Sequence, residues 1–262
     1  YDIAGTAALA GLAGSATALG SGATAAAIGA SAHRGRRPGL TAGYLVGAAG
    51  ALGAVAAAIL GSLPLLLLAG LAFGAGGGAN LQARYAAADL ALPERRASDL
   101  ALVVWATTVG AVLGPNLTDP GARLAGIVGI PELAGPYLAS GTAFLLAAVT
   151  VAVRLRPDPL LLARRLGGVT LDATRVGVGR ALREGSAAIR SVPAARAATA
   201  TIAAAHATMV GVMSMTPVHM ADHGAAVRLV GLTISLHIAG MYALSPVVGR
   251  ITDRYGARAS LR

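Results

Sequence analysis

The chain has 262 residues, of which 55% are hydrophobic and 12% are charged, and its mean hydropathy is +0.68. An average soluble domain carries about 25% charged residues, so this composition excludes a water-soluble globular protein. The chain contains no cysteine, which excludes disulfide bonds and thiolate metal sites. The formal net charge of +10 is compatible with nucleic-acid binding, but the positions of the charges give it another explanation.

Uncharged segments predict transmembrane helices. The segment from Gly39 to Gln82 holds two crossings, because about 20 apolar residues span the hydrocarbon core as a helix. A soluble array of Ala-rich helices would need a charged outer face on each helix, which these segments lack. The expected fold class is therefore an all-α membrane protein. Seven spans are expected, at residues 4–31, 39–60, 64–91, 98–117, 134–154, 196–218 and 229–249.

All 21 basic residues are arginines, and their distribution predicts the orientation in the membrane. Eighteen lie on one set of alternate connections, two (Arg123 and Arg228) lie on the opposite side, and Arg84 lies inside a span. Connections rich in arginine stay in the cytoplasm, so we expect a multi-pass protein of the cell membrane with residue 1 outside. Topology and contact with anionic lipids then explain the positive charge without any nucleic acid.

Residues 155–193 differ from the spans on either side. They are rich in arginine and proline, and the sequence GRALREGSAAIR at 179–190 has the pattern of a basic amphipathic helix that lies on the membrane surface. We therefore expect a first membrane unit at 1–154, a cytoplasmic basic linker at 155–193 and a second membrane unit at 194–262. The chain starts without methionine and stops just past a cytoplasmic loop, which indicates a fragment of a longer protein.

The sequence GRITDRYGAR, at the end of the seventh span, resembles the cytoplasmic loop signature of the major facilitator superfamily, G-x-x-x-D-R-x-G-x-R. Glycine at its start allows two membrane helices to approach closely, and the aspartate carboxylate can cap or pair at a helix end. The resemblance implies a transporter. The matching residues are Gly249, Asp253, Arg254, Gly256 and Arg258.

A degraded copy of this signature, HRGRRPG, follows the first span. Gly35, Arg36 and Arg37 remain, but Ala32 stands where the acid is expected and His33 where the first arginine is expected. In the superfamily this loop follows the second helix of each half. The resemblance therefore implies a partial major facilitator fold of about seven helices, numbers two to eight of twelve, with the first half lacking its first helix and the second half truncated.

Sulfur and imidazole groups gather near the end of the chain, where four of the five methionines lie between His206 and Met220. At 100° per residue, His206, Met209 and Met213 fall within about 60° of one another on a helix. His237 and Met241 are four residues apart and share a face of the next helix. Counted along the helices, both groups lie near the depth at which transporters bind substrate, and thioethers are soft donors that favour Cu(I).

The motifs M-x-x-x-M and H-x-x-x-M resemble those of the CcoA-like copper importers, a group within the major facilitator superfamily. The resemblance implies that Met209, Met213, His237 and Met241 bind copper as the transported substrate, and the helical stripe adds His206. We therefore expect a monomeric transporter that is not an enzyme and has no resident cofactor. Its partners would be the lipid bilayer and a copper ion or another small solute.

Two alternatives stay open. The sequence GAVLGP at 110–115 is similar to the fifth-helix motif of antiporters in the superfamily, and it favours a general small-molecule or drug exporter. In that case the methionines only line an apolar cavity, since methionine commonly fills gaps in packed cores. A membrane metalloenzyme is the less favoured alternative, because no carboxylate accompanies the histidines at the midplane.

Other polar residues within or near the spans have less definite roles. Asn80, Arg84 and Trp105 are candidates for the wall of a cavity. Arg84 either snorkels toward the cytoplasm or pairs with Asp89. Toward the outer side, a further group either forms a funnel for incoming metal or belongs to an exposed loop: Met215, His219, Met220 and His223.

Overall fold

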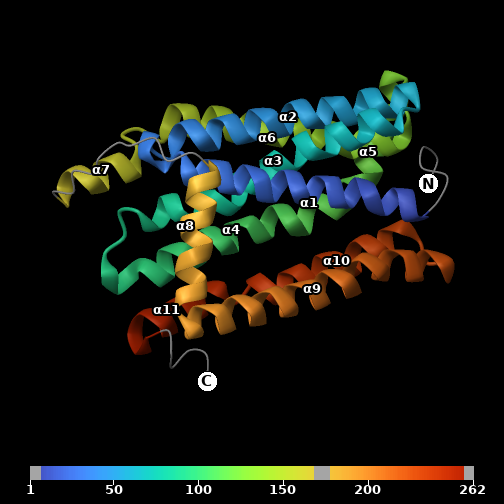
Figure 1. Cartoon of the computed structure of the whole chain (residues 1–262). Coiled ribbons are helices and arrows are strands. Elements are labelled where there is room, and N and C mark those ends of the chain that lie inside the picture. Colours follow the sequence, from blue (N-terminus) through green and yellow to red (C-terminus); the bar gives the residue numbers. More distant parts are fainter. Residues whose placement is uncertain (1–6, 168–177, 257–262) are drawn as a thin grey trace.

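The computed structural model describes residues 7–167 and 178–256, and within them the chain is helical with no β-strand (Figure 1). The all-α fold class predicted from the sequence is confirmed. The helices are α1 (Ala7–Ala30), α2 (Arg37–Leu60), α3 (Leu63–Ala88), α4 (Arg96–Asn116), α5 (Thr118–Val128), α6 (Gly135–Arg154), α7 (Pro159–Leu166), α8 (Val178–Ser191), α9 (Pro193–Asp222), α10 (Val227–Tyr242) and α11 (Ser245–Tyr255).

Six stretches of the described chain are long and apolar enough to cross a membrane, one fewer than the seven spans expected. They correspond to α2, α3, α4, α6 together with α7, α9, and the pair α10–α11. Helix α1 is 24 residues long and lies along the others, but Gly, Ser and Thr dilute its apolar character, so it is not among the six.

The last predicted span is a broken helix. It runs as α10 to Tyr242 and resumes as α11 at Ser245. The break follows from Pro246, because a proline ring inside a helix clashes with the carbonyl four residues earlier, here that of Tyr242. The span thus bends close to Met241, one of the predicted site residues.

Small residues hold the first helices together. Helix α3 packs against both α1 and α2, and α6 covers the other side of α2. Glycines at the α3 contacts leave no room for a side chain: a Cβ at Gly74 would collide with the α1 backbone at Thr17, and one at Gly50 with the α3 backbone at Phe73. Close backbone approach of this kind is the main source of packing between membrane helices. Leu40 is fully buried in the resulting core.

The remaining helices form a more open layer. Helix α4 packs along α10 and α11, while α9 contacts mainly α8 and α10. Figure 1 shows α9, α10 and α11 (orange to red) on the opposite side of α4 from α2 and α6. Helix α9 has no buried residue in the described chain, so one of its faces is available to line a cavity shared with α10 and α4.

Candidate functional site

A cavity of about 410 Å³ opens between α4, α9 and α10. Four of the five residues that the sequence selected as metal ligands line it: Met209, Met213, His237 and Met241. Most of the remaining wall is apolar, contributed by side chains such as Ile234. The cavity therefore offers a few polarizable and imidazole groups in apolar surroundings.

Helical spacing explains why these four residues line one cavity. Met209 and Met213 are one turn apart on α9, and His237 and Met241 are one turn apart on α10, so each pair faces one direction. A short connection between the two helices returns the chain antiparallel, which brings the pairs to the same cavity. The His237 ring makes no hydrogen bond to any described residue and can accept a ligand at either nitrogen.

His206, the fifth predicted ligand, does not line this cavity, and its side chain is exposed. It lies three residues before Met209, which places it about 60° around the helix and nearer the α8 end of α9. Its direction on the helix lies between those of Met213 and Val210, which both line the cavity, so what separates His206 from the cavity is its position along the helix axis. Within the described residues no three His, Asp or Glu side chains gather into one cluster, so the donors of this site are chiefly thioethers.

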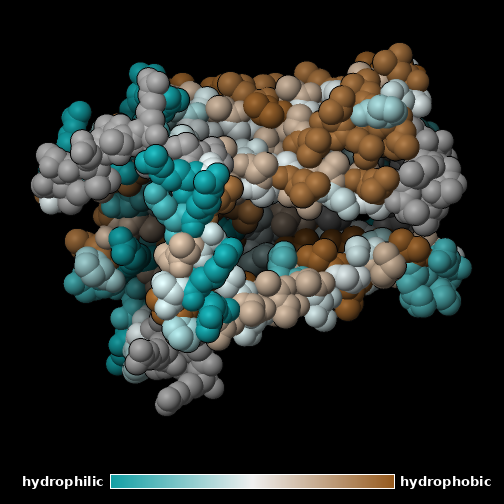
Figure 2. Space-filling model, viewed as in Figure 1, coloured by the Kyte–Doolittle hydropathy of each residue, from teal (hydrophilic) through white to brown (hydrophobic). Residues whose placement is uncertain are grey.

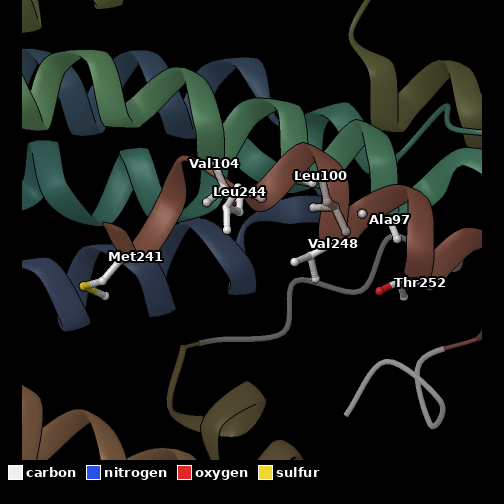
Figure 3. A pocket seen from close by; sticks show the side chains of 10 residues that line it. Ala97, Leu100, Val104, Met241, Leu244, Val248 and Thr252 are labelled. Atoms are coloured by element: carbon white, nitrogen blue, oxygen red, sulfur yellow. The ribbon is translucent and has the colours of Figure 1, made fainter. Parts of the chain in front are cut away.

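A second cavity of about 410 Å³ lies between α4 and the broken span, nearer the arginine-rich side. Figure 3 shows Leu100 and Val104 of α4 facing Leu244 and Val248. Met241 lines both cavities, so the two share one wall. The break between α10 and α11 lies at this point.

The second cavity ends where the signature loop meets α4. The Asp253 carboxylate accepts hydrogen bonds from the backbone N–H groups of Ala97 (2.9 Å) and Ser98 (2.8 Å). These are orphan donors at the start of α4, whose own N-cap residue makes no side-chain hydrogen bond. A Cβ at Gly249 would lie only 2.6 Å from the Cβ of Ala101, so glycine is required for this approach.

The other signature residues lie around this contact. The guanidinium of Arg254 lies 5.3 Å from the centre of the Tyr255 ring. Gly256 ends α11 with φ +83°, a backbone conformation that favours glycine. Arg258 lies outside the described residues.

At the opposite end of α4 a small polar group joins this helix to α10. The Asn116 side-chain amide donates to the Ser235 hydroxyl at 3.1 Å, and that hydroxyl donates to the Val112 carbonyl at 2.9 Å. Ser235 is 3% exposed. Buried polar groups of this kind are stable only when they are hydrogen-bonded, so α4 is attached to the broken span near both of its ends.

The degraded first loop is completed by a residue that the sequence analysis missed. Asp158, at the start of α7, accepts a hydrogen bond from the backbone N–H of Arg37 (2.8 Å) and also caps α7 through Leu160 (3.1 Å). Gly35 has φ +95°, and a Cβ there would collide with this carboxylate. The sequence Pro-Asp-Pro at 157–159 carried the signal, since Asp before Pro is a typical helix start.

Of the two roles that the sequence left open for Arg84, pairing with Asp89 is not observed. Asp89 instead forms a two-point ion pair with Arg36, at 2.9 and 3.1 Å, because the loop places that guanidinium directly beside it. Arg84 makes no ion pair or hydrogen bond with the described residues. Neither Arg84 nor the other two candidates, Asn80 and Trp105, lines the two cavities above.

Apolar membrane-length helices, the broken span and the signature loop docked on α4 define a polytopic helical membrane protein. The chain belongs to the Major Facilitator Superfamily, whose family model matches residues 1–262. This confirms the family that the loop signature indicated.

Three relatives have overlapping sequences. The chain is 39% identical to the uncharacterized MFS-type transporter YddS of Bacillus subtilis over 97% of its own length and 58% of that protein. It is 40% identical to the uncharacterized MFS-type transporter YdeG of the same organism, over 86% of this chain and 51% of that protein. It is 30% identical to the riboflavin transporter RfnT of Brucella anthropi, over 85% of this chain and 52% of that protein. The chain thus spans about half the length of these relatives. No solved structure matches it.

Proposed function

We propose that the protein transports a small solute across the cell membrane by alternating access and that this solute is copper. The observation that carries the proposal is the convergence of Met209, Met213, His237 and Met241 on one cavity between three membrane helices. Transporters of this architecture bind substrate within the membrane, between helices that move relative to one another.

The chemistry of the cavity supports a monovalent copper ion. Thioether sulfur is a soft, uncharged donor that favours Cu(I), and neutral imidazole completes such a site. Neither group has to lose a proton to bind, so the site adds no negative charge to the membrane interior. Two thioethers on α9 and a thioether and an imidazole on α10 offer up to four donors.

The arginine distribution supports an orientation in which α7 and α8 lie on the cytoplasmic side. Figure 2 shows hydrophilic residues gathered over that end of the molecule and apolar residues over much of the remaining face. Arginine-rich connections are cytoplasmic in most membrane proteins. We therefore assign this end to the cytoplasm and the connection between α9 and α10 to the outside.

An organic solute is the second candidate, and the similarity to RfnT favours it. The cavity wall is mostly apolar, and Ser214 and Tyr242 add two hydroxyl groups. Pockets for small organic molecules combine an apolar wall with a few polar groups. In this case the methionines contribute shape rather than donor atoms.

Uptake by cells that express the protein from its complete gene separates the two candidates. We expect cell copper to rise above that of cells with an empty vector, and Met209→Leu and His237→Ala to remove the rise, because each deletes a donor. Met209→Leu also keeps the volume of the side chain closely similar. Met215→Leu is the matched control, since Met215 is 61% exposed on the same helix and does not line the cavity. Copper and riboflavin contents are measured in the same cultures at equal protein levels. Unchanged copper in every strain, with flavin uptake that survives Met209→Leu, contradicts the copper proposal.

A further inference from the structure

We propose that His219 and His223, at the outer end of α9, form a second copper-binding site that captures the ion before it reaches the cavity. This inference rests on the proposed function for its role but on separate residues for its chemistry. The two histidines are one helical turn apart, and their ring centres lie 4.2 Å from each other. Two imidazoles at this separation can bind one ion together.

The hydrogen bonding of His223 leaves the Nε2 nitrogen of its ring free to bind a metal ion. Its Nδ1 lies 2.8 Å from the backbone carbonyl of His219. A carbonyl oxygen only accepts, so Nδ1 carries the proton and Nε2 keeps its lone pair. Histidines that bind metals commonly donate their other ring N–H to a backbone carbonyl, which fixes the ring and raises the basicity of the ligating nitrogen. The His223 ring is therefore already oriented as a ligand.

The surroundings favour a cation. Both side chains are exposed, and the His219 ring makes no hydrogen bond to described residues. His223 is the C-cap residue of the 30-residue α9. The C-terminus of a helix carries partial negative charge from its free carbonyl groups, which stabilises a bound cation.

A methionine connects this pair to the cavity. Met220 follows Met213 by seven residues on α9, so the two occupy the same face two turns apart, and Met220 is partly buried. His219 lies six residues beyond Met213, a rise of about 9 Å along the helix axis. The helix thus presents imidazole at its exposed end and thioether donors nearer to and within the cavity, and imidazole suits copper as a ligand.

The test is binding of one equivalent of Cu²⁺ to the purified protein, expressed from its complete gene; Cu²⁺ serves here as a paramagnetic probe of the paired imidazoles, because Cu(I) has no unpaired electron. Electron paramagnetic resonance with ¹⁵N-histidine labelling should show two imidazole nitrogens bound to the ion. His219→Ala and His223→Ala should each leave at most one nitrogen and weaken the affinity about a hundredfold, the gain expected when a second ligand is already tethered nearby. His206→Ala is the matched control, since His206 is exposed on the same helix but has no neighbouring imidazole. It should change neither the number of bound imidazole nitrogens nor the affinity for copper.

The outcomes separate this site from the transport cavity. A wild-type spectrum without two imidazole nitrogens, or two nitrogens that persist in both variants, overturns the capture site even if copper transport holds. Loss of the nitrogens in His219→Ala and His223→Ala supports it even if Met209→Leu leaves uptake intact. In uptake assays the capture variants should raise the copper concentration needed for half-maximal uptake without abolishing uptake at high copper.

Discussion

At the scale of single residues, two aspartates accept hydrogen bonds from backbone N–H groups of segments that are distant in sequence. Asp253 receives two N–H groups of α4, and Asp158 receives the N–H of Arg37 from the first loop. Hydrogen bonds to charged acceptors are stronger than those between neutral groups. Each carboxylate therefore fixes a loop to a helix end at the boundary of the membrane.

The first prediction at this scale concerns Asp158. Asp158→Ala removes the cap of α7 and the acceptor of the Arg37 N–H, and loss of a cap costs about 1 kcal/mol. For a protein of this size that corresponds to a fall in Tm of about 2–4 °C, measured by thermal unfolding in detergent. Asp119→Ala is the control, because Asp119 is exposed at the start of α5. An equal fall in Tm in both variants would show that the removed negative charge, and not the lost hydrogen bonds of Asp158, lowers the stability.

The residues that the sequence predicted and the residues that it missed differ in how far apart along the chain their interacting partners lie. The four cavity residues follow from one-turn spacing on two consecutive helices, which a sequence displays directly. The partner of Asp89 and the role of Asp158 depend on segments 53 and 121 residues away, and no local pattern encodes such distances. His206 lies outside the cavity for a related reason, since a helical wheel gives direction but not how far a cavity extends along the helix axis.

At the scale of elements, the positions of the helices follow closely from the uncharged segments, whereas their interruptions do not. The break between α10 and α11 was signalled by Pro246, yet Pro217 lies inside α9 without ending it. A membrane helix tolerates proline where neighbouring groups satisfy the freed carbonyl. Sequence alone cannot distinguish these two cases, because the outcome depends on the packing around each proline.

Helix α8 gives the prediction at this scale. It runs across the membrane-length helices in Figure 1 and leaves Leu182 and Ile189 exposed, at 56% and 40%. These two residues share one face, and Arg183 and Arg190 lie on another. A helix of this kind rests at the membrane surface with its apolar face among the lipid chains.

A single fluorophore can report the depth of each face of α8. The described chain contains no cysteine, so Leu182→Cys, Ile189→Cys and the control Ala187→Cys can be labelled singly provided the complete protein also lacks reactive thiols. In vesicles with phosphatidylglycerol, we expect spin-labelled lipids to quench positions 182 and 189 strongly and position 187 weakly. Equal quenching at the three positions would contradict a surface-bound helix.

At the scale of the whole molecule, α4 is the element that links the two groups of helices. It contacts α3 on one side and α10 and α11 on the other. Its attachment to α11 uses the aspartate of the signature loop, and its attachment to α10 uses Ser235. In the proposed alternating access, one group of helices rocks against the other, so one such attachment has to open. The carboxylate contact lies at the arginine-rich side beside the second cavity.

Removing that carboxylate should favour opening at the arginine-rich side. Asp253→Ala deletes both acceptors at the start of α4, while the close approach at Gly249 stays possible. Spin labels at Leu92→Cys and Ile251→Cys, which are exposed positions on either side of this contact, report the separation by pulsed electron resonance. We expect a longer and broader distance distribution than in the parent. Asp99→Ala is the control, since Asp99 lies at the same end of α4 but holds no hydrogen bond to α11. A distribution unchanged by Asp253→Ala would mean that packing alone keeps this side closed, so the signature aspartate would then stabilise the start of α4 without gating the path from the cavity.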